Sequence, residues 1–397
     1  MTEVEAVLWL LWIAAIMLLV PLLAWIALLW ALAFRSRRPA PPPPAAGVTP
    51  TFLVIVPAHD EKGMIAGIVH RILAADYPRD ALRLVVVADN CSDGTAEAAE
   101  AAGAGVLRRT DPGNPGKGQA IAHALEALKQ EPCDAILFLD ADSEPDAGYF
   151  RVMAPYVARG DRAVQGRYDV ADPGRTWFTR LTSVSFVLRN FWQYPAMDAL
   201  RLGVPLRGSG MCFAASLIRD TGWAARGLTE DTEMTLDLRR NGVRVVYAPQ
   251  AVSGQFMPAT PAGAVTQRLR WSAGERGVRA VLLRREIPVA LRAGRWRDAL
   301  FLCLLAAPPF SLQLFAALAA GFAAWLASPP LLPVAALAVA LYAGYFCLGL
   351  QRFDRGAVAA VLMLPVFVLW RVGVHVAACL KKPASWIRTP RSDVGDH

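Results

Sequence analysis

Residues 135–142 read AILFLDAD, a short apolar run that ends abruptly in two carboxylates. The same pattern occurs at 52–61 (FLVIVPAHDE) and at 84–93 (LVVVADNCSD). Apolar runs of this length without alternation are typical of strands that are buried on both faces. The Ala-rich helical segments between them lie at about 62–75, 94–102 and 117–130. The stretch 50–260 is therefore predicted to form a parallel α/β sheet.

The polar residues that end these runs lie where such a sheet binds its ligands, beyond the carboxyl ends of the strands. We therefore expect the three polar clusters to meet in one crevice. Asp140 and Asp142 stand at i and i+2, so in an extended segment their carboxylates lie on the same side. Such a pair can hold Mg²⁺ or Mn²⁺ together with ligand phosphates. A turn or a helix cap is the alternative for this pair taken alone.

Two further segments have both a structural and a functional interpretation. Residues 89–95 (DNCSDGT) suit a turn followed by a capped helix, and they also suit a ligand-binding cluster at a strand end. Residues 113–118 (GNPGKG) form a flexible loop that opens a helix. Backbone N–H groups at a helix start attract phosphate, and Lys117 would add a positive charge. A surface turn is the alternative here.

The second half of the stretch adds an acidic and a basic motif. Glu230 and Asp231 stand before an amphipathic segment, either as the acids of a helix N-terminus or with one of them as a general base. Residues 267–271 (QRLRW) lie in a basic segment that leads to an apolar region. They suit an interfacial helix, or a site with an indole platform for a sugar and guanidinium donors for a diphosphate.

Apolar residues make up 55% of the 397-residue chain, and they concentrate at 7–34 and 298–380. This distribution excludes a wholly soluble protein, a disordered chain and a channel built only of helices. Residues 7–34 exceed the roughly 20 residues that cross a bilayer. The predicted units are a membrane helix with a proline-rich linker (1–49), the α/β domain (50–260), an interfacial segment (261–297), a membrane region (298–380) and a tail (381–397).

The net charge of +8 invites a nucleic-acid partner, but its location argues against one. Arg35, Arg37 and Arg38 follow the first apolar stretch, and further arginines precede the second. Basic residues at the edges of membrane spans are favoured on the cytoplasmic side and by anionic lipids. We therefore expect a multi-pass protein of a bacterial-type inner (plasma) membrane, with residues from 35 onward in the cytoplasm. The six cysteines have no metal-ligand spacing and are expected to be reduced thiols.

The order and spacing of these motifs over about 52–275 resemble the inverting family 2 glycosyltransferases. The resemblance is to the membrane-embedded group that includes the cellulose, chitin-oligosaccharide and hyaluronan synthases. It implies a Rossmann-like GT-A fold that binds a nucleotide-sugar in a cytoplasmic α/β domain flanked by transmembrane helices. Ser143 follows the acid pair, where some synthases have a histidine near the metal.

The same resemblance implies a role for each motif. It makes Asp231, next to Glu230, the catalytic base, and it makes Asp140 and Asp142 the ligands of Mg²⁺ or Mn²⁺. The residues implied to bind the nucleotide-sugar are Pro57, Ala58, Glu61, Asp89, Lys117, Asp140, Gln267 and Arg270. Those implied to bind the acceptor are Gly208, Ser209, Gly210 and Trp271.

The expected reaction is single-displacement transfer from a UDP-hexose or UDP-N-acetylhexosamine to a growing β-linked polysaccharide or oligosaccharide. The main alternative within the enzyme class is one addition to a lipid acceptor, as in ceramide glucosyltransferases. A catalytically silent scaffold or translocation subunit is the alternative outside that class. The complete set of acids and the QxxRW motif argue against a silent protein.

Overall fold

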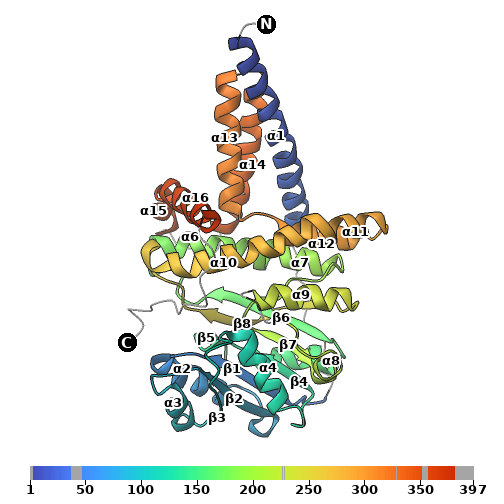
Figure 1. The fold of residues 1–397 in the computed structure, drawn as a ribbon, viewed down its shortest axis with the longest axis vertical. Helices are drawn as coiled ribbons and strands as arrows, with labels where there is room; N and C mark the ends of the chain where they lie inside the picture. Colours follow the sequence, from blue (N-terminus) through green and yellow to red (C-terminus); the bar gives the residue numbers. More distant parts are fainter. Residues whose placement is uncertain are drawn as a thin grey trace.

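The computed structural model describes residues 3–36, 47–225, 227, 229–327, 329–350 and 356–380. Most of the proline-rich linker predicted before residue 50 and all of the tail 381–397 lie outside this part of the chain. Three layers follow one another along the long axis (Figure 1): an α/β domain, a layer of helices lying across it, and a stalk of long helices that carries the N-terminus.

The described residues form a sheet of eight strands in the order β3-β2-β1-β4-β7-β6-β8-β5. The strands are β1 (Phe52–Ala58), β2 (Leu82–Asp89), β3 (Gly105–Arg109), β4 (Ala135–Phe138), β5 (Ser143–Pro145), β6 (Ala163–Val170), β7 (Met211–Ala214) and β8 (Val245–Gln255). β3, β2, β1 and β4 pair in parallel, and the strands predicted from the three apolar runs are present.

The prediction of a wholly parallel sheet is wrong beyond β4. β7 pairs antiparallel with both β4 and β6, and β5 pairs antiparallel with β8. β7 runs opposite to both of its neighbours, and its four residues carry no pattern that would give the direction in advance. The sheet is therefore mixed, with its parallel part built from the first half of the domain.

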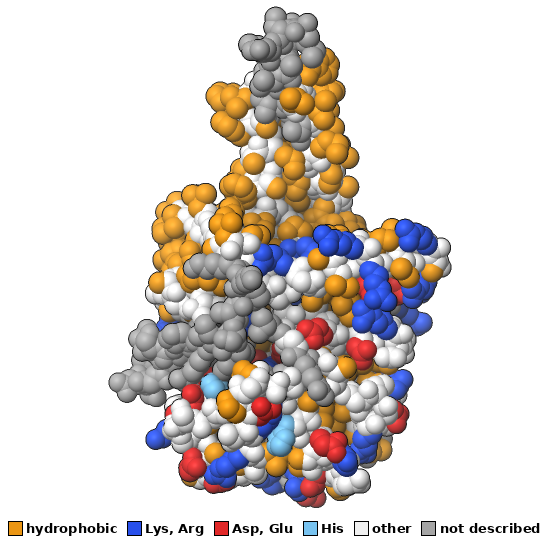
Figure 2. Space-filling model, in the orientation of Figure 1, with side chains coloured by type: hydrophobic (Ala, Val, Ile, Leu, Met, Phe, Trp, Pro, Cys, Tyr) orange, Lys and Arg blue, Asp and Glu red, His pale blue; other side chains and the backbone are white. Residues whose placement is uncertain are grey.

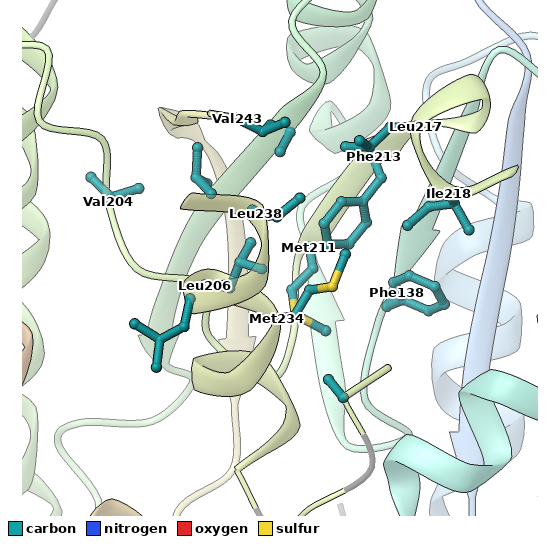
Figure 3. Packing of buried hydrophobic residues seen from close by; sticks show 14 of the residues in the cluster. Phe138, Val204, Leu206, Met211, Phe213, Leu217, Ile218, Met234, Leu238 and Val243 are labelled. Carbon is teal, nitrogen blue, oxygen red and sulfur yellow. The ribbon is translucent and has the colours of Figure 1, made fainter. Parts of the chain in front are cut away.

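Helices cover both faces of the sheet. They are α2 (Lys62–Leu73), α3 (Thr95–Ala101), α4 (Lys117–Ala127), α5 (Tyr149–Ala158), α8 (Ala215–Thr221) and α9 (Glu230–Arg240). Alternate residues of β1 belong to two separate apolar clusters, because successive side chains of a strand point to opposite faces. Figure 3 shows one of these clusters, where Phe138 and Phe213 from neighbouring strands pack near Met234 of α9. Burial on both faces explains why the strands read as continuous apolar runs.

The middle layer and the stalk come mostly from the second half of the chain (Figure 1). The layer contains α6 (Trp177–Val187), η2 (Leu188–Gln193), α7 (Tyr194–Ala199), α10 (Pro261–Val281), α11 (Ile287–Arg292) and α12 (Trp296–Ala306). The stalk consists of α1 (Glu3–Arg35), α13 (Phe310–Ala327) and α14 (Leu332–Leu350), and beside its base lie α15 (Gly356–Leu362) and α16 (Leu364–Leu380). Figure 2 shows apolar side chains over the stalk and basic side chains around its base.

Two helices in the described part of the chain are long and apolar enough to cross a membrane, Ile16–Arg35 and Leu332–Leu350. The predicted apolar stretch 298–327 forms two helices, α12 and α13, bent by 82°. Pro308 and Pro309 interrupt the run at this bend, since proline removes a backbone donor and restricts the residue before it. As a result α12 lies in the layer while α13 rises in the stalk.

Candidate active site

A cavity of about 890 Å³ lies at the carboxyl ends of β1, β2 and β4, between the sheet and the helix layer. It brings together residues from every motif singled out in the sequence. The predicted site residues that line it are Pro57, Ala58, Glu61, Asp89, Lys117, Asp140, Asp142, Gly208, Glu230, Asp231, Gln267, Arg270 and Trp271. The prediction that the three polar clusters meet in one crevice is confirmed.

Lys117 occupies the centre of the acidic part of this cavity. It is the first residue of α4, after Gly116, whose φ of +132° is a conformation that favours glycine. Its Nζ atom lies 2.5 Å from Asp140 Oδ1 and 3.2 Å from Glu230 Oε1, and it also donates to the carbonyl of Gly208. Although burial disfavours its charged form, these carboxylates raise the pKa of Lys117 above its ordinary value. One ammonium group thus joins three segments that are distant in sequence.

The acid pair at the end of β4 is held together by a residue that the sequence analysis missed. Gln255 Nε2 donates to Asp142 Oδ1 at 2.5 Å and to Asp140 Oδ2 at 3.3 Å. The other amide atom of the side chain, Gln255 Oε1, is buried without a hydrogen-bond partner among the described residues. Gln255 ends β8, far from the acid pair in sequence, and no local pattern connects the two. The carboxylates therefore converge on one point beside the cavity.

This convergence fits a hard divalent cation. Two carboxylate oxygens already meet at a single nitrogen, and Mg²⁺ or Mn²⁺ binds such oxygens together with phosphate. Rotating the Gln255 amide by half a turn would replace that nitrogen with the buried oxygen, and O and N of an amide are assigned from such contacts. Three protein oxygens would then face the cation, and no histidine would be required next to Ser143.

The loop before β7, residues 208–210, contacts the backbone of the acid pair. Ser209 is fully buried, accepts a hydrogen bond from the Asp140 backbone N–H at 3.2 Å, and its hydroxyl lies 2.6 Å from that of Ser143. A Cβ at Gly210 would lie 2.9 Å from the Tyr149 hydroxyl. Neither Ser209 nor Gly210 lines the cavity, so the structure gives these two predicted acceptor residues a supporting position instead. Gly208 does line it.

Asp89 organises the part of the cavity that lies at the ends of β2 and β3. Its carboxylate pairs with Arg109 at 2.6 Å, and both side chains are buried. Arg109 also contacts Asp111 at 2.7 Å, and Asp89 Oδ2 accepts from the Gly116 N–H at 3.4 Å. The loop 113–116 is thereby fixed against the ends of β2 and β3. Arg109 was not expected from the sequence, because its strand is short and polar.

Residues 89–95 also form the predicted turn. Asp93 Oδ1 accepts from the backbone N–H of Thr95 at 3.0 Å as α3 begins. Asp60 Oδ1 accepts from the N–H of Ser92 at 2.7 Å. The turn is therefore confirmed, although Gly94 at the start of α3 has no side-chain cap; Asp89 lines the cavity, and its role in ligand binding stays a prediction.

The two acids of α9 lie in its first turn and in the cavity at the same time. Burial is the main cause that raises the pKa of Glu230 to about 7, against the opposing effect of Lys117. Asp231 is half-buried and accepts from the backbone N–H of Thr232 at 2.6 Å. Glu230 thus pairs with Lys117, whereas Asp231 lines the cavity wall.

The QxxRW residues reach the cavity from α10. Trp271 packs beside Val170, Phe186 and Met257, and the Arg268 guanidinium lies over its ring at 4.7 Å from the centroid. α10 passes close to the residue before α9, because a Cβ on Gly274 would overlap the side chain of Thr229. Gly274 therefore sets the distance between α10 and the start of α9.

These observations define one class of protein. An acid pair at the end of β4, a lysine at the start of α4 and a second acid pair at the start of α9 face one cavity of an α/β sheet. That is the arrangement of a GT-A glycosyltransferase. The chain belongs to glycosyltransferase family 2: residues 50–274, more than half of it, match the family described as "Glycosyltransferase like family 2". The predictions of the family, the fold and the transferase class are confirmed.

Comparison with known proteins gives the same family. The chain is 28% identical over 236 residues to "Probable glycosyltransferase YdaM" of Bacillus subtilis, covering 58% of this chain and 56% of that protein. It is 26% identical over 232 residues to "Beta-monoglucosyldiacylglycerol synthase" of Synechocystis, covering 57% of this chain and 48% of that one. The chain thus spans about half the length of the curated relatives it matches.

A solved structure extends the likeness of fold to almost the whole chain. It is "Mannosyltransferase PcManGT from Pyrobaculum calidifontis in complex with GDP-Man and Mn2+". The alignment covers 95% of this chain and 98% of that one, with a TM-score of 0.56 and 21% sequence identity. The fold including its helical layer and stalk is therefore shared.

We predict that Gly274→Ala reduces turnover although alanine favours helices. The added methyl group overlaps Thr229, so α10 must move away from the acids of α9. Gly277→Ala is the matched control, because a Cβ at that position in the same helix meets nothing within 4 Å. Its helix is expected to gain up to about 1 kcal/mol. Nucleoside diphosphate release by both variants measures the effect, and equal turnover of the two would contradict it.

We also predict a pH-dependent stability that Glu230 controls. Its pKa is about 7 in the folded protein, against an ordinary 4.5, so the folded state binds a proton that the unfolded state releases. Stability should therefore fall as the pH rises from about 4.5 to 7, by up to about 3 kcal/mol from this group. Glu230→Gln should remove that part of the fall, and Asp237→Asn in the same helix should not. Melting temperatures at pH 5 and 8 test this, and parallel profiles for all three proteins would refute it.

Proposed function

We propose that this protein transfers a sugar from a nucleotide-sugar to a lipid acceptor at the cytoplasmic face of a membrane, with inversion of the anomeric centre. The observation that carries the proposal is a single cavity with two different ends. One end holds Lys117, the acid pair and Asp231, and the other is lined by apolar residues at the base of the stalk. Candidate membrane helices stand directly above it.

The polar end suits the donor. Lys117 and Arg270 supply positive charge for a diphosphate, and the N–H groups at the start of α4 supply further donors. Asp89 is held by Arg109 beyond the ends of the strands, where the nucleobase of the donor would lie. A UDP-hexose or UDP-N-acetylhexosamine remains the expected donor, and the GDP-Man bound in the Pyrobaculum structure makes GDP-sugars part of the same test.

Asp140 and Asp142, with the Gln255 oxygen, would hold Mg²⁺ or Mn²⁺, and Mn²⁺ is named with the Pyrobaculum enzyme. When bound, the ion neutralises charge that builds on the departing diphosphate, which is worth several kcal/mol. In the absence of the ion, the Gln255 amide nitrogen instead donates to both carboxylates and holds them in one orientation. Lys117 contributes to the same neutralisation from the other side of Asp140.

Asp231 is the group placed to act as the base. It takes the proton of the acceptor hydroxyl as that oxygen attacks the anomeric carbon, while the bond from this carbon to the diphosphate breaks on the opposite side. A positioned base contributes roughly 10²–10⁴-fold to the rate. Trp271, fixed by Arg268, offers a flat face that orients the acceptor. Glu230 keeps Lys117 in place.

The apolar end of the cavity favours a lipid over a polymer as the acceptor. It is lined by residues such as Leu29, Leu314 and Phe346, one from each helix of the stalk. A relative also has a lipid in its name, "Beta-monoglucosyldiacylglycerol synthase". Extension of a β-linked polysaccharide is the second candidate. It is motivated by "Cellulose synthase 1 catalytic subunit [UDP-forming]" of Komagataeibacter xylinus, which is 24% identical to this chain over 254 residues. The match covers 60% of this chain and 32% of that protein. Mass analysis separates them, because a polymerase gives a ladder of product lengths.

We expect Asp231→Asn to lower the rate of sugar transfer roughly 10²–10⁴-fold with little change in the KM for the donor. The substitution removes the base but keeps the size of the side chain. Asp237→Asn, in the same helix but outside the cavity lining, is the control. Release of nucleoside diphosphate from a panel of UDP- and GDP-sugars, with the protein in lipid nanodiscs and Mn²⁺ present, is the measurement. Near-normal turnover of Asp231→Asn would exclude its role as base.

We expect Gln255→Ala to weaken Mn²⁺ binding roughly 10–100-fold. The substitution removes the third oxygen that would face the ion, and without the ion it also removes the amide nitrogen that holds the two carboxylates together. Electron paramagnetic resonance of Mn²⁺ with UDP measures the affinity without turnover, and Asn241→Ala, at the far end of α9, is the control. Unchanged affinity in Gln255→Ala would show that the acid pair binds the ion without it.

A further inference from the structure

Three arginines lie on the membrane side of the cavity; the proposed reaction uses one of them, Arg268, only as a support for Trp271, and it gives Arg189 and Arg371 no role. Arg189 of η2, Arg268 of α10 and Arg371 of α16 all line this cavity, and α10 packs against α16. Among the described residues, none of the three has an acidic partner within 4 Å, and Arg268 Nε and Arg371 Nη1 are buried without hydrogen bonds. The cluster therefore brings several cations together with few compensating groups.

The charge around these arginines is strongly one-sided. Glu275 is the acid on the same helix as Arg268 that lines this part of the cavity, and its closest cation is Arg279, at 4.0 Å. Burial first, and then the positive charges of Arg371 and Arg189, lower the pKa of Arg268. Gathering like charges away from water is unfavourable unless an anion joins them. The cluster thus has the electrostatic character of an anion site.

The wall next to the arginines is apolar. Leu29, Leu314 and Phe346 come from the stalk helices, and Phe367 and Val368 precede Arg371 on α16. Two of the stalk helices are the candidate membrane spans. A ligand that fits both surfaces has an anionic group for the arginines and hydrocarbon for the wall. The donor diphosphate has no hydrocarbon part and does not fit this description. The cations proposed to bind it are others: Lys117, which lies among the acids, and Arg270 of the QxxRW motif.

We propose that this end of the cavity binds the phosphate of an anionic lipid, and that the head group of this lipid carries the acceptor hydroxyl. The inference rests on the proposed function and narrows its substrate class. The hydroxyl oxygen forms the new bond to the anomeric carbon, its proton passes to Asp231, and the nucleoside diphosphate leaves with the electron pair of the broken bond. The lipid phosphate is unchanged and serves as the anchor.

The test measures lipid binding to the full chain in detergent by native mass spectrometry. The probes are dioleoyl phosphatidylglycerol, dioleoylglycerol, which has the same chains without phosphate, and inorganic phosphate. The variant is Arg189→Gln with Arg371→Gln, its rescue is lysine at both positions, and the control is Arg285→Gln, an exposed arginine of the interfacial segment.

We expect the double glutamine variant to lose affinity for phosphatidylglycerol roughly tenfold or more, because both substitutions remove a positive charge and weaken the charge-assisted hydrogen bonds to the phosphate. The lysine variant should recover part of it, and Arg285→Gln should bind as the unaltered protein does. Dioleoylglycerol should bind weakly to all of them. Inorganic phosphate alone should not compete at millimolar concentration, since it lacks the hydrocarbon part.

Three results would overturn the inference. The first is equal phosphatidylglycerol binding by the double glutamine variant, and the second is equal binding of dioleoylglycerol and phosphatidylglycerol by the unaltered protein. The third is a loss of UDP affinity in the double variant with lipid binding intact, which would assign the arginines to the donor. Arginine-dependent lipid binding in a protein that turns over no nucleotide-sugar would keep the lipid site and overturn the proposed function.

Discussion

The ammonium group of Lys117 is the contact on which the site depends. It links the start of α4 to Asp140 after β4, to the loop before β7 and to Glu230 of α9. Without it, the carboxylates of Asp140 and the buried Glu230 would lie close together with no positive charge between them, which is costly away from water. The same positive charge is available to a diphosphate that enters beside it. In the function we propose, the same group therefore serves both the stability of the site and the binding of the donor.

Much of this arrangement could be predicted from the sequence. The runs before Pro57, Asp89 and Asp140 identify buried strands, and parallel topology alone brings their polar ends together. Other features depend on long-range pairing that leaves no local pattern. Gln255 reaches the acid pair only because β8 lies beside β5, and Arg109 meets Asp89 only because β3 lies beside β2. The mixed half of the sheet escaped prediction for the same reason, since the short strand β7 shows its direction only through its partners.

The acceptor end of the cavity could be predicted least. The basic residues near the apolar stretches are explained equally well by lipid head groups outside the protein. The structure divides these basic residues into an exposed group, which includes Arg285, and a group that lines the cavity, which includes Arg268 and Arg371. The bend between α12 and α13 leaves α12 in the layer and α13 in the stalk, and residues of both helices line the cavity. In the reaction we propose, the donor therefore comes from the cytoplasm and the acceptor from the bilayer.

A cryo-electron microscopy map of the full chain in a lipid nanodisc with UDP and Mn²⁺ would show whether the cavity binds a nucleoside diphosphate among these residues. We expect density for the diphosphate in contact with Lys117, for the ion between Asp140 and Asp142, and for the nucleobase near Asp89. Nucleotide bound on another surface, or a cavity without nucleotide at saturating UDP and Mn²⁺, would contradict it.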